Sequence, residues 1–171
     1  SAATSHYRDL IEDAYQRLLA ASHRPGAIGN HALPIDPALI TDPAVLRAPH
    51  HHYPAWDFPT PTGTPVYAVA GGRVVAAGFD GNCGNGVTID ADDGARYTYC
   101  HASELRTRAG AIVAPGELLL FSGNTGFSTG PHLHLQIAYA GALRCPQPLL
   151  VAWYEGKDAS PAEAPGSGCS Y

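Results

Sequence analysis

The chain has no methionine, little charge and no long apolar run. None of its apolar stretches reaches the roughly 18 residues that a bilayer-spanning helix needs, and its first residues lack the basic-then-apolar pattern of a signal peptide. We therefore expect no membrane insertion and a mature or trimmed chain. Lysine and arginine number only 10 against 15 aspartates and glutamates, a formal net charge of -5. That balance excludes nucleic acid and anionic membranes as main partners, because both require clustered cations.

Cysteine pairs with metal-ligand spacing are also missing. None of the four cysteines stands in a Cys-x-x-Cys pair, which argues against a cysteine zinc cluster. An even number of cysteines in a methionine-free, glycine-rich chain fits disulfides and an oxidising compartment, so we expect a secreted protein. We predict that Cys83 pairs with Cys100 and Cys145 with Cys169, because each pair is near in sequence and the second would pin the C-terminal tail.

Glycine and proline are abundant, at 19 and 15 residues, and they divide the sequence into short segments. From residue 64 onward, runs of β-type composition alternate with Gly, Asn and Asp turns. These runs are residues 66–69, 73–76, 86–90, 95–99, 117–122 and 132–139. The pattern predicts a mainly β domain built on an antiparallel sheet meander.

One domain with extensions is the expected organisation of 171 residues. Residues 1–47 combine an amphipathic helix over residues 7–19, capped by Ser5, with a proline-rich connector. This helix either packs on its own domain or links it to a removed upstream domain or a regulatory partner. Residues 48–154 form the main domain, and residues 155–171 are expected to be a loose tail held only by Cys169.

Histidine is frequent, with nine residues, and its placement is informative. His132 and His134 are two residues apart on a predicted strand, so both rings project from the same face of the sheet. Leu133, Leu135 and Ile137 would bury the opposite face and leave the histidine face as the floor of a cleft. The alternative is an exposed pair on a solvated face.

A carboxylate closely follows another group of histidines. Asp57 stands just beyond the run His50, His51 and His52. One carboxylate with two imidazoles is a standard set of three protein ligands for catalytic zinc. The alternatives are a chance surface run of histidines or the remnant of a purification tag, although tags are longer and normally terminal.

Four ordered motifs resemble the lysostaphin/LytM-type family of zinc endopeptidases over residues 48–138. They are a His-to-Asp segment ending at Asp57, then Gly63-Thr64-Pro65-Val66 with Ala68 and Gly72, then Tyr99-Cys100-His101, and then Gly123-Asn124-Thr125-Gly126 continuing through Ser128-Thr129-Gly130-Pro131 to His132-Leu133-His134. The resemblance implies an open, barrel-like antiparallel β catalytic domain over residues 48–154. It also implies a secreted enzyme that uses zinc to hydrolyse peptide bonds in the stem peptides or cross-links of bacterial peptidoglycan.

The family pattern makes Asp57 and His134 zinc ligands. Most members carry a histidine ligand four residues before the aspartate, but here that position is Tyr53. The remaining ligand must come from the preceding run, as in the subgroup with a Tyr-Pro-Ala stretch between the two ligands; we choose His51, with His50 second. The departure motivates an alternative function, a catalytically silent peptidoglycan-binding or regulatory module. A structural zinc protein, or a peptidase acting outside the wall, is a third.

The same resemblance assigns His101 and His132 to catalysis, beside the water that attacks the peptide bond, and either could be the base. Zinc makes this attack possible at neutral pH by activating water and polarising the carbonyl. Asn124 and Ser128 lie in a Gly-rich segment that either contacts a peptide substrate or only shapes a tight turn before the histidine strand. Tyr99 either lines the site and contacts substrate or packs in the sheet.

Overall fold

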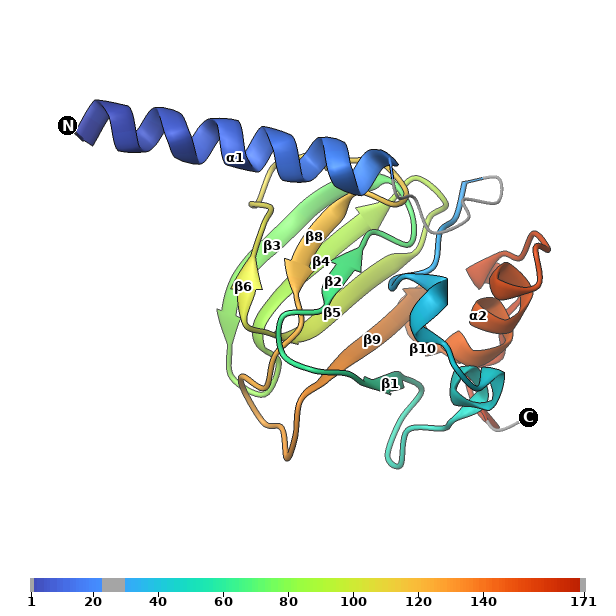
Figure 1. Ribbon diagram of the computed structural model, residues 1–171. Coiled ribbons are helices and arrows are strands. Elements are labelled where there is room, and N and C mark those ends of the chain that lie inside the picture. Colours follow the sequence, from blue (N-terminus) through green and yellow to red (C-terminus); the bar gives the residue numbers. More distant parts are fainter. Residues whose placement is uncertain (1, 23–29, 170–171) are drawn as a thin grey trace.

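The computed structural model describes residues 2–22 and 30–169, which form two antiparallel sheets with helices at the periphery (Figure 1). The seven-stranded sheet has the order β1-β9-β5-β4-β3-β7, with β10 also paired to β9, and the three-stranded sheet has the order β2-β8-β6. This arrangement confirms the mainly β, open antiparallel fold.

The elements have the following bounds. The large sheet contains β1 (Trp56–Pro59), β3 (Gly72–Asp80), β4 (Gly84–Ala91), β5 (Arg96–Ala102), β7 (Ile112–Val113), β9 (His132–Tyr139) and β10 (Ala142–Arg144). The small sheet contains β2 (Pro65–Tyr67), β6 (Glu104–Leu105) and β8 (Leu118–Phe121). The helices are α1 (Ala2–Ser22), α2 (Pro146–Tyr154) and the 3-10 turns η1 (Pro37–Leu39), η2 (Pro43–Arg47) and η3 (Pro161–Glu163).

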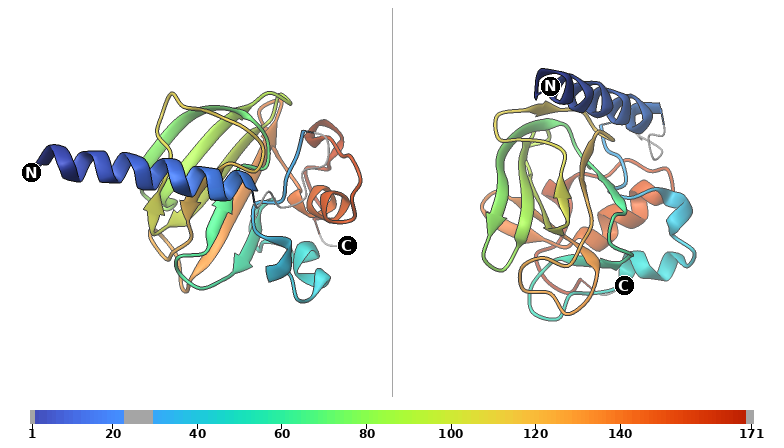
Figure 2. Two further views of the ribbon diagram at one scale, coloured as in Figure 1. Left: turned by 45° about the horizontal axis from the view of Figure 1, so that its top comes forward. Right: turned by 60° about the vertical axis from the view of Figure 1, so that its left-hand side comes forward.

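The small sheet packs over the curved large sheet, and the main core lies between them (Figure 2). Leu119 and Leu120 of β8 join this core from one side. Leu133, Leu135 and Ile137 of β9 join it from the other, and each is fully buried. Since successive side chains of a strand point to opposite faces, this burial leaves His132, His134 and Gln136 on the other face of β9. The expected division of this strand into an apolar face and a histidine face is confirmed.

All six predicted strands are present, with small differences at their ends. The structure adds β1, β6, β7 and β10, which the sequence did not signal. The most consequential of them is β1, because this short strand carries Asp57 and pairs with β9. The apolar segment at residues 148–154 is helical and forms most of α2.

Helix α1 differs from its prediction in two respects. It begins at Ala2, so Ser5 lies within the helix and is not its cap. The described part of its apolar stripe is between 54% and 65% exposed at Tyr7, Leu10, Ile11 and Tyr15, so these side chains do not pack on the domain. The rest of the predicted stripe, at residues 18 and 19, lies outside the described side chains. No helix in the described residues is long and apolar enough to cross a bilayer.

The connector before the histidine run is part of the folded body. Leu33, Ile35, Ile40 and Leu46 are buried in the main core. His31 forms an isolated antiparallel bridge to Ala70, which ties the start of this segment to the connection between β2 and β3. Residues 31–47 therefore contribute to the stability of the domain that follows them.

The C-terminal segment is held by more than Cys169. The predicted disulfide between Cys145 and Cys169 is present. In addition, Pro161 and Ala164 are buried, and the backbone N–H of Cys145 donates to the carbonyl oxygen of Pro165 at 2.7 Å. The expectation of a loose tail is corrected: η3 contacts β9, and Ala164 is part of the main core.

Candidate metal and active site

The pairing of β1 with β9 brings two predicted ligands together. Asp57 lies directly opposite His134, and its Oδ1 atom is 2.6 Å from Nδ1 of that ring. Its Oδ2 atom is 3.6 Å from Nε2 of His50, which reaches the site from the loop before β1. One ligand atom from each of these three residues lies within 4.8 Å of the others. This set of a carboxylate and two imidazoles is therefore close enough to hold one metal ion.

The structure places His50, and not our first choice His51, in this group. The His50 side chain is 15% exposed, and its ring packs against Tyr53 with 4.4 Å between ring centroids. His51 and His52 are exposed, and neither joins a three-ligand group among the described residues. The physical reason is that neighbouring side chains of a loop point in different directions, so the ring of His50 faces Asp57 while His51 and His52 lie exposed in the cleft wall.

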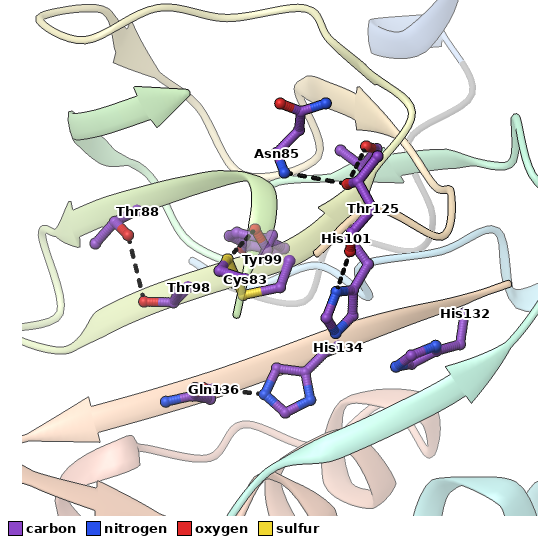
Figure 3. Close-up of a disulfide and its surroundings, with 12 residues drawn as sticks. Cys83, Asn85, Thr88, Thr98, Tyr99, His101, Thr125, His132, His134 and Gln136 are labelled. Carbon is purple, nitrogen blue, oxygen red and sulfur yellow. Dashed lines mark hydrogen bonds between the residues drawn. A yellow bond between two sulfur atoms is a disulfide. The ribbon is translucent and has the colours of Figure 1, made fainter. Parts of the chain in front are cut away.

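His101 and His132 stand beside this group, with 4.6 Å between their ring centroids. Nδ1 of His101 donates to the carbonyl oxygen of Thr125 at 2.7 Å (Figure 3). Nδ1 of His132 donates to the carbonyl oxygen of Gly130 at 2.8 Å. Because a carbonyl oxygen only accepts, each neutral ring keeps an unprotonated Nε2. Both rings can thus accept a proton from a water molecule in the space between them and Asp57.

The disulfide between Cys83 and Cys100 is present as predicted, and it adjoins His101. Cys83 lies between β3 and β4, so the bond ties that hairpin to β5. The backbone N–H of His101 also donates to the carbonyl oxygen of Cys83 at 2.7 Å. His101 has a φ of 67°, a left-handed conformation that non-glycine residues rarely adopt. Such backbone strain persists only where the surroundings hold it, and here the disulfide and this hydrogen bond do so.

Burial and neighbouring charges set the protonation of the site. Burial raises the pKa of Asp57, but the His134 hydrogen bond and the nearby imidazoles outweigh it and leave that pKa below 3.8. Burial lowers the pKa of His50 below 6.5 against the opposing charge of Asp57. Burial also lowers the pKa of His101, with the Thr125 carbonyl opposing. At neutral pH the carboxylate is therefore ionised and these two imidazoles are neutral, as metal ligation and general base catalysis require.

An open cleft of about 850 Å³ lies over these residues. Ser128 lines it, and its Oγ atom is 3.1 Å from Nδ1 of His132. Asn124 is exposed but is not among the lining residues. Tyr99 is fully buried, and its hydroxyl accepts the N–H of Val69 at 2.8 Å. Tyr99 therefore packs in the sheet, which corrects its prediction as a substrate contact; of the three predicted contacts, only Ser128 lies in the cleft wall.

Sequence reasoning did not place several residues in the cleft wall, among them Tyr53, Phe127 and Gln136. Gln136 lies two residues after His134 on β9, so the period of the strand could have placed it on the histidine face. Phe127 is 81% exposed at the rim, and nothing in its loop sequence signals this position. The sequence singled out Tyr53 only because most members of the family have a ligand histidine at that position.

Comparison with known proteins identifies the family. Residues 51–146 match the family model of peptidase family M23. Peptidoglycan DD-endopeptidase ShyA of Vibrio cholerae is 38% identical over 106 residues, which are 62% of this chain and 24% of ShyA. The chain spans less than a quarter of the length of ShyA and of three other curated relatives, with 17% to 24% of their lengths covered.

Solved structures support the same relationship. The catalytic domain of the antimicrobial peptidase lysostaphin from Staphylococcus simulans has a TM-score of 0.54 at 29% identity, covering 78% of this chain and 96% of that one. A zinc containing peptidase from Vibrio cholerae has a TM-score of 0.51 at 30% identity, covering 53% of this chain and 28% of that one. With the open antiparallel fold and the clustered histidines and aspartate, these matches show that the chain belongs to peptidase family M23.

Proposed function

We propose that this chain is the catalytic domain of a zinc-dependent endopeptidase that hydrolyses peptide bonds in bacterial cell-wall peptidoglycan. One observation carries the proposal. A three-ligand group, His50, Asp57 and His134, lies in the same cleft as two further histidines, His101 and His132, whose Nε2 atoms are free to accept protons. A structural metal site is closed by its ligands, whereas this one opens onto a cleft.

The ligand chemistry fits zinc. Imidazole nitrogens and a carboxylate oxygen are ligands that zinc accepts, and three protein ligands with an open side are typical of catalytic rather than structural sites. When bound, zinc supplies Lewis-acid polarisation of the scissile carbonyl and lowers the pKa of water. His50, Asp57 and His134 would hold it, because each offers a ligand atom at the centre of the group.

His101 and His132 provide the proton transfers. The one that acts as base accepts the proton of the attacking water at Nε2 and passes it to the leaving amine, which completes the cleavage of the amide bond. The other, when protonated, stabilises the negative charge that develops on the carbonyl oxygen. The Thr125 and Gly130 carbonyls keep Nδ1 of the two rings engaged, so each ring presents the same nitrogen to substrate.

Peptidoglycan is proposed as the substrate because ShyA, a relative over 62% of this chain, is a peptidoglycan DD-endopeptidase. The two disulfides support a location outside the reducing cytoplasm, as a wall-directed enzyme requires. The cleft is open enough for an extended polymer to lie across it. The alternative of a catalytically silent module arose from Tyr53 in the place of a ligand histidine. It loses that support because His50 completes the three-ligand group.

The decisive experiment combines metal content with wall digestion. The wild-type chain should hold about one zinc per molecule and release soluble, amine-bearing fragments from purified peptidoglycan. His50→Ala should lose both properties, because two protein ligands remain. His51→Ala is the matched control and should retain both, since its exposed ring belongs to no ligand group among the described residues. Zinc loss in His51→Ala with normal zinc in His50→Ala would shift the ligand back to our first choice. A wild-type chain that binds zinc without releasing fragments would favour the silent module.

A further inference from the structure

The two ring nitrogens of His134 face different partners. Nδ1 is 2.6 Å from Oδ1 of Asp57, on the side where His50 also lies. Nε2 is 3.0 Å from Oε1 of Gln136, on the opposite side of the ring (Figure 3). Gln136 reaches this nitrogen because residues two apart on a strand share a face, and no turn or loop intervenes. The same strand thus supplies both the proposed ligand and the group behind it.

A neutral imidazole carries its proton on one nitrogen, and a metal ion binds the other. An amide oxygen only accepts hydrogen bonds, so Oε1 of Gln136 selects the form of His134 with the proton on Nε2. Oδ1 of Asp57 also accepts, so without a metal ion Nδ1 donates a proton to it. A metal ion held by Nδ1 and Asp57 would replace that proton, while the acceptor at Nε2 keeps the other one in place. Ligand histidines commonly have such a partner on the second nitrogen, and its removal typically weakens metal binding.

We propose that Gln136 is the positioning residue of the metal site. It fixes the tautomer and the ring orientation of His134 so that Nδ1, and not Nε2, serves as the ligand atom. This inference rests on the metal site proposed above. It also explains why Gln136 lines the cleft although it belongs to neither the ligand group nor the pair of proposed bases.

Tyr53 is a weaker partner of the same nitrogen. Its hydroxyl is 3.4 Å from Nε2 of His134, longer than a good hydrogen bond of this type. Its ring packs on His50, at 4.4 Å between centroids. Tyr53 therefore contacts the two proposed ligands His50 and His134 but is not itself a member of the ligand group. Its phenol adds little to the acceptor that Gln136 already provides.

The test measures zinc affinity directly, by competition with a chromophoric chelator on the purified full chain. Gln136→Leu removes the acceptor and should weaken zinc binding roughly 10- to 100-fold. Gln136→Glu restores an acceptor of similar reach and should bind zinc at least as tightly as wild type. Thr98→Val is the matched control, because Thr98 pairs with Gln136 across β5 and β9 and lines the same cleft. It should bind zinc as wild type does, and Tyr53→Phe should differ by less than about 3-fold.

A second measurement separates positioning from folding. Long-range proton-nitrogen NMR of the zinc-loaded protein should show His134 protonated at Nε2 in wild type and in Gln136→Glu. A proton on Nδ1 in wild type, or wild-type zinc affinity in a folded Gln136→Leu variant, would overturn the role of Gln136 and leave the proposed peptidase intact. A wild-type chain that takes up no zinc would overturn both proposals.

Discussion

The disulfide between Cys83 and Cys100 should contribute to both stability and turnover. In the chain-entropy description, a cross-link over a sequence separation of 17 stabilises the fold by about 3 kcal/mol. For a chain of 171 residues, each kcal/mol corresponds to roughly 2–4 °C in Tm. The double variant Cys83→Ala/Cys100→Ala should therefore melt about 6–12 °C lower. It should also turn over more slowly, because the bond holds the backbone of His101 in its left-handed conformation.

A second disulfide supplies the matched control. Cys145 and Cys169 close a sequence separation of 24, so the double variant Cys145→Ala/Cys169→Ala should also lose about 3 kcal/mol. Neither of these cysteines lines the cleft, so kcat of the folded variant should equal that of wild type. Thermal unfolding gives the stability change. Fragment release from peptidoglycan, well below both unfolding midpoints, gives kcat. Equal kcat in both double variants would refute the claim that the Cys83–Cys100 bond positions His101.

Three other perturbations test the site and the fold. His101→Ala should keep its zinc and lower kcat by roughly 10²- to 10⁴-fold; metal analysis showing zinc loss would make His101 a ligand instead of a base. Burial lowers the pKa of His101 below 6.5, so its neutral, proton-accepting form persists into mildly acidic solution, and the acidic limb of kcat/KM should lie below that pH. A limb centred above it would contradict the assignment. His31→Ala should lower the free energy of unfolding by about 1–3 kcal/mol, because Asp93 loses a buried partner at 2.9 Å. A urea titration showing less than about 0.5 kcal/mol would count against this contact.

The histidine strand could be predicted from sequence because one simple rule governs it. With a period of two, alternation of His132, Leu133, His134 and Leu135 fixes which side chains face the core and which face the cleft. The disulfide pairs were also predictable, since short sequence separations limited the choice. For these features, local pattern and tertiary structure agree.

The loop before β1 could not be predicted in the same way. Three consecutive histidines offer no periodicity, and the direction of each ring depends on how the segment through Tyr53 and Pro54 turns toward the sheet. The ring of His50 packs against Tyr53 and lies near Asp57, and only the folded chain shows these contacts. The four-residue strand β1 was equally hidden, because Asp57 and Pro59 have low strand propensity and pairing with β9 overrides it.

The N-terminal connector illustrates a different limit. Leu33, Ile35 and Ile40 stand in a proline-rich segment without helical or strand period, so their sequence indicates an irregular linker. The structure buries all three, because the core accepts apolar side chains from irregular backbone as readily as from strands. Burial of this kind leaves no pattern that a single sequence can reveal.

The register of β9 against its two neighbours links metal binding to the folding reaction. His134 lies opposite Asp57 on β1 and opposite Cys100 on β5, so one strand must be aligned with both partners before the ligands meet. A slip of one residue would turn Leu133 and Leu135 toward the cleft and the histidines toward the core. A chain misaligned in this way could not capture zinc. If the chain binds zinc as proposed, the rate of zinc uptake during refolding would report when β9 reaches its native alignment with β1 and β5, instead of averaging over the molecule.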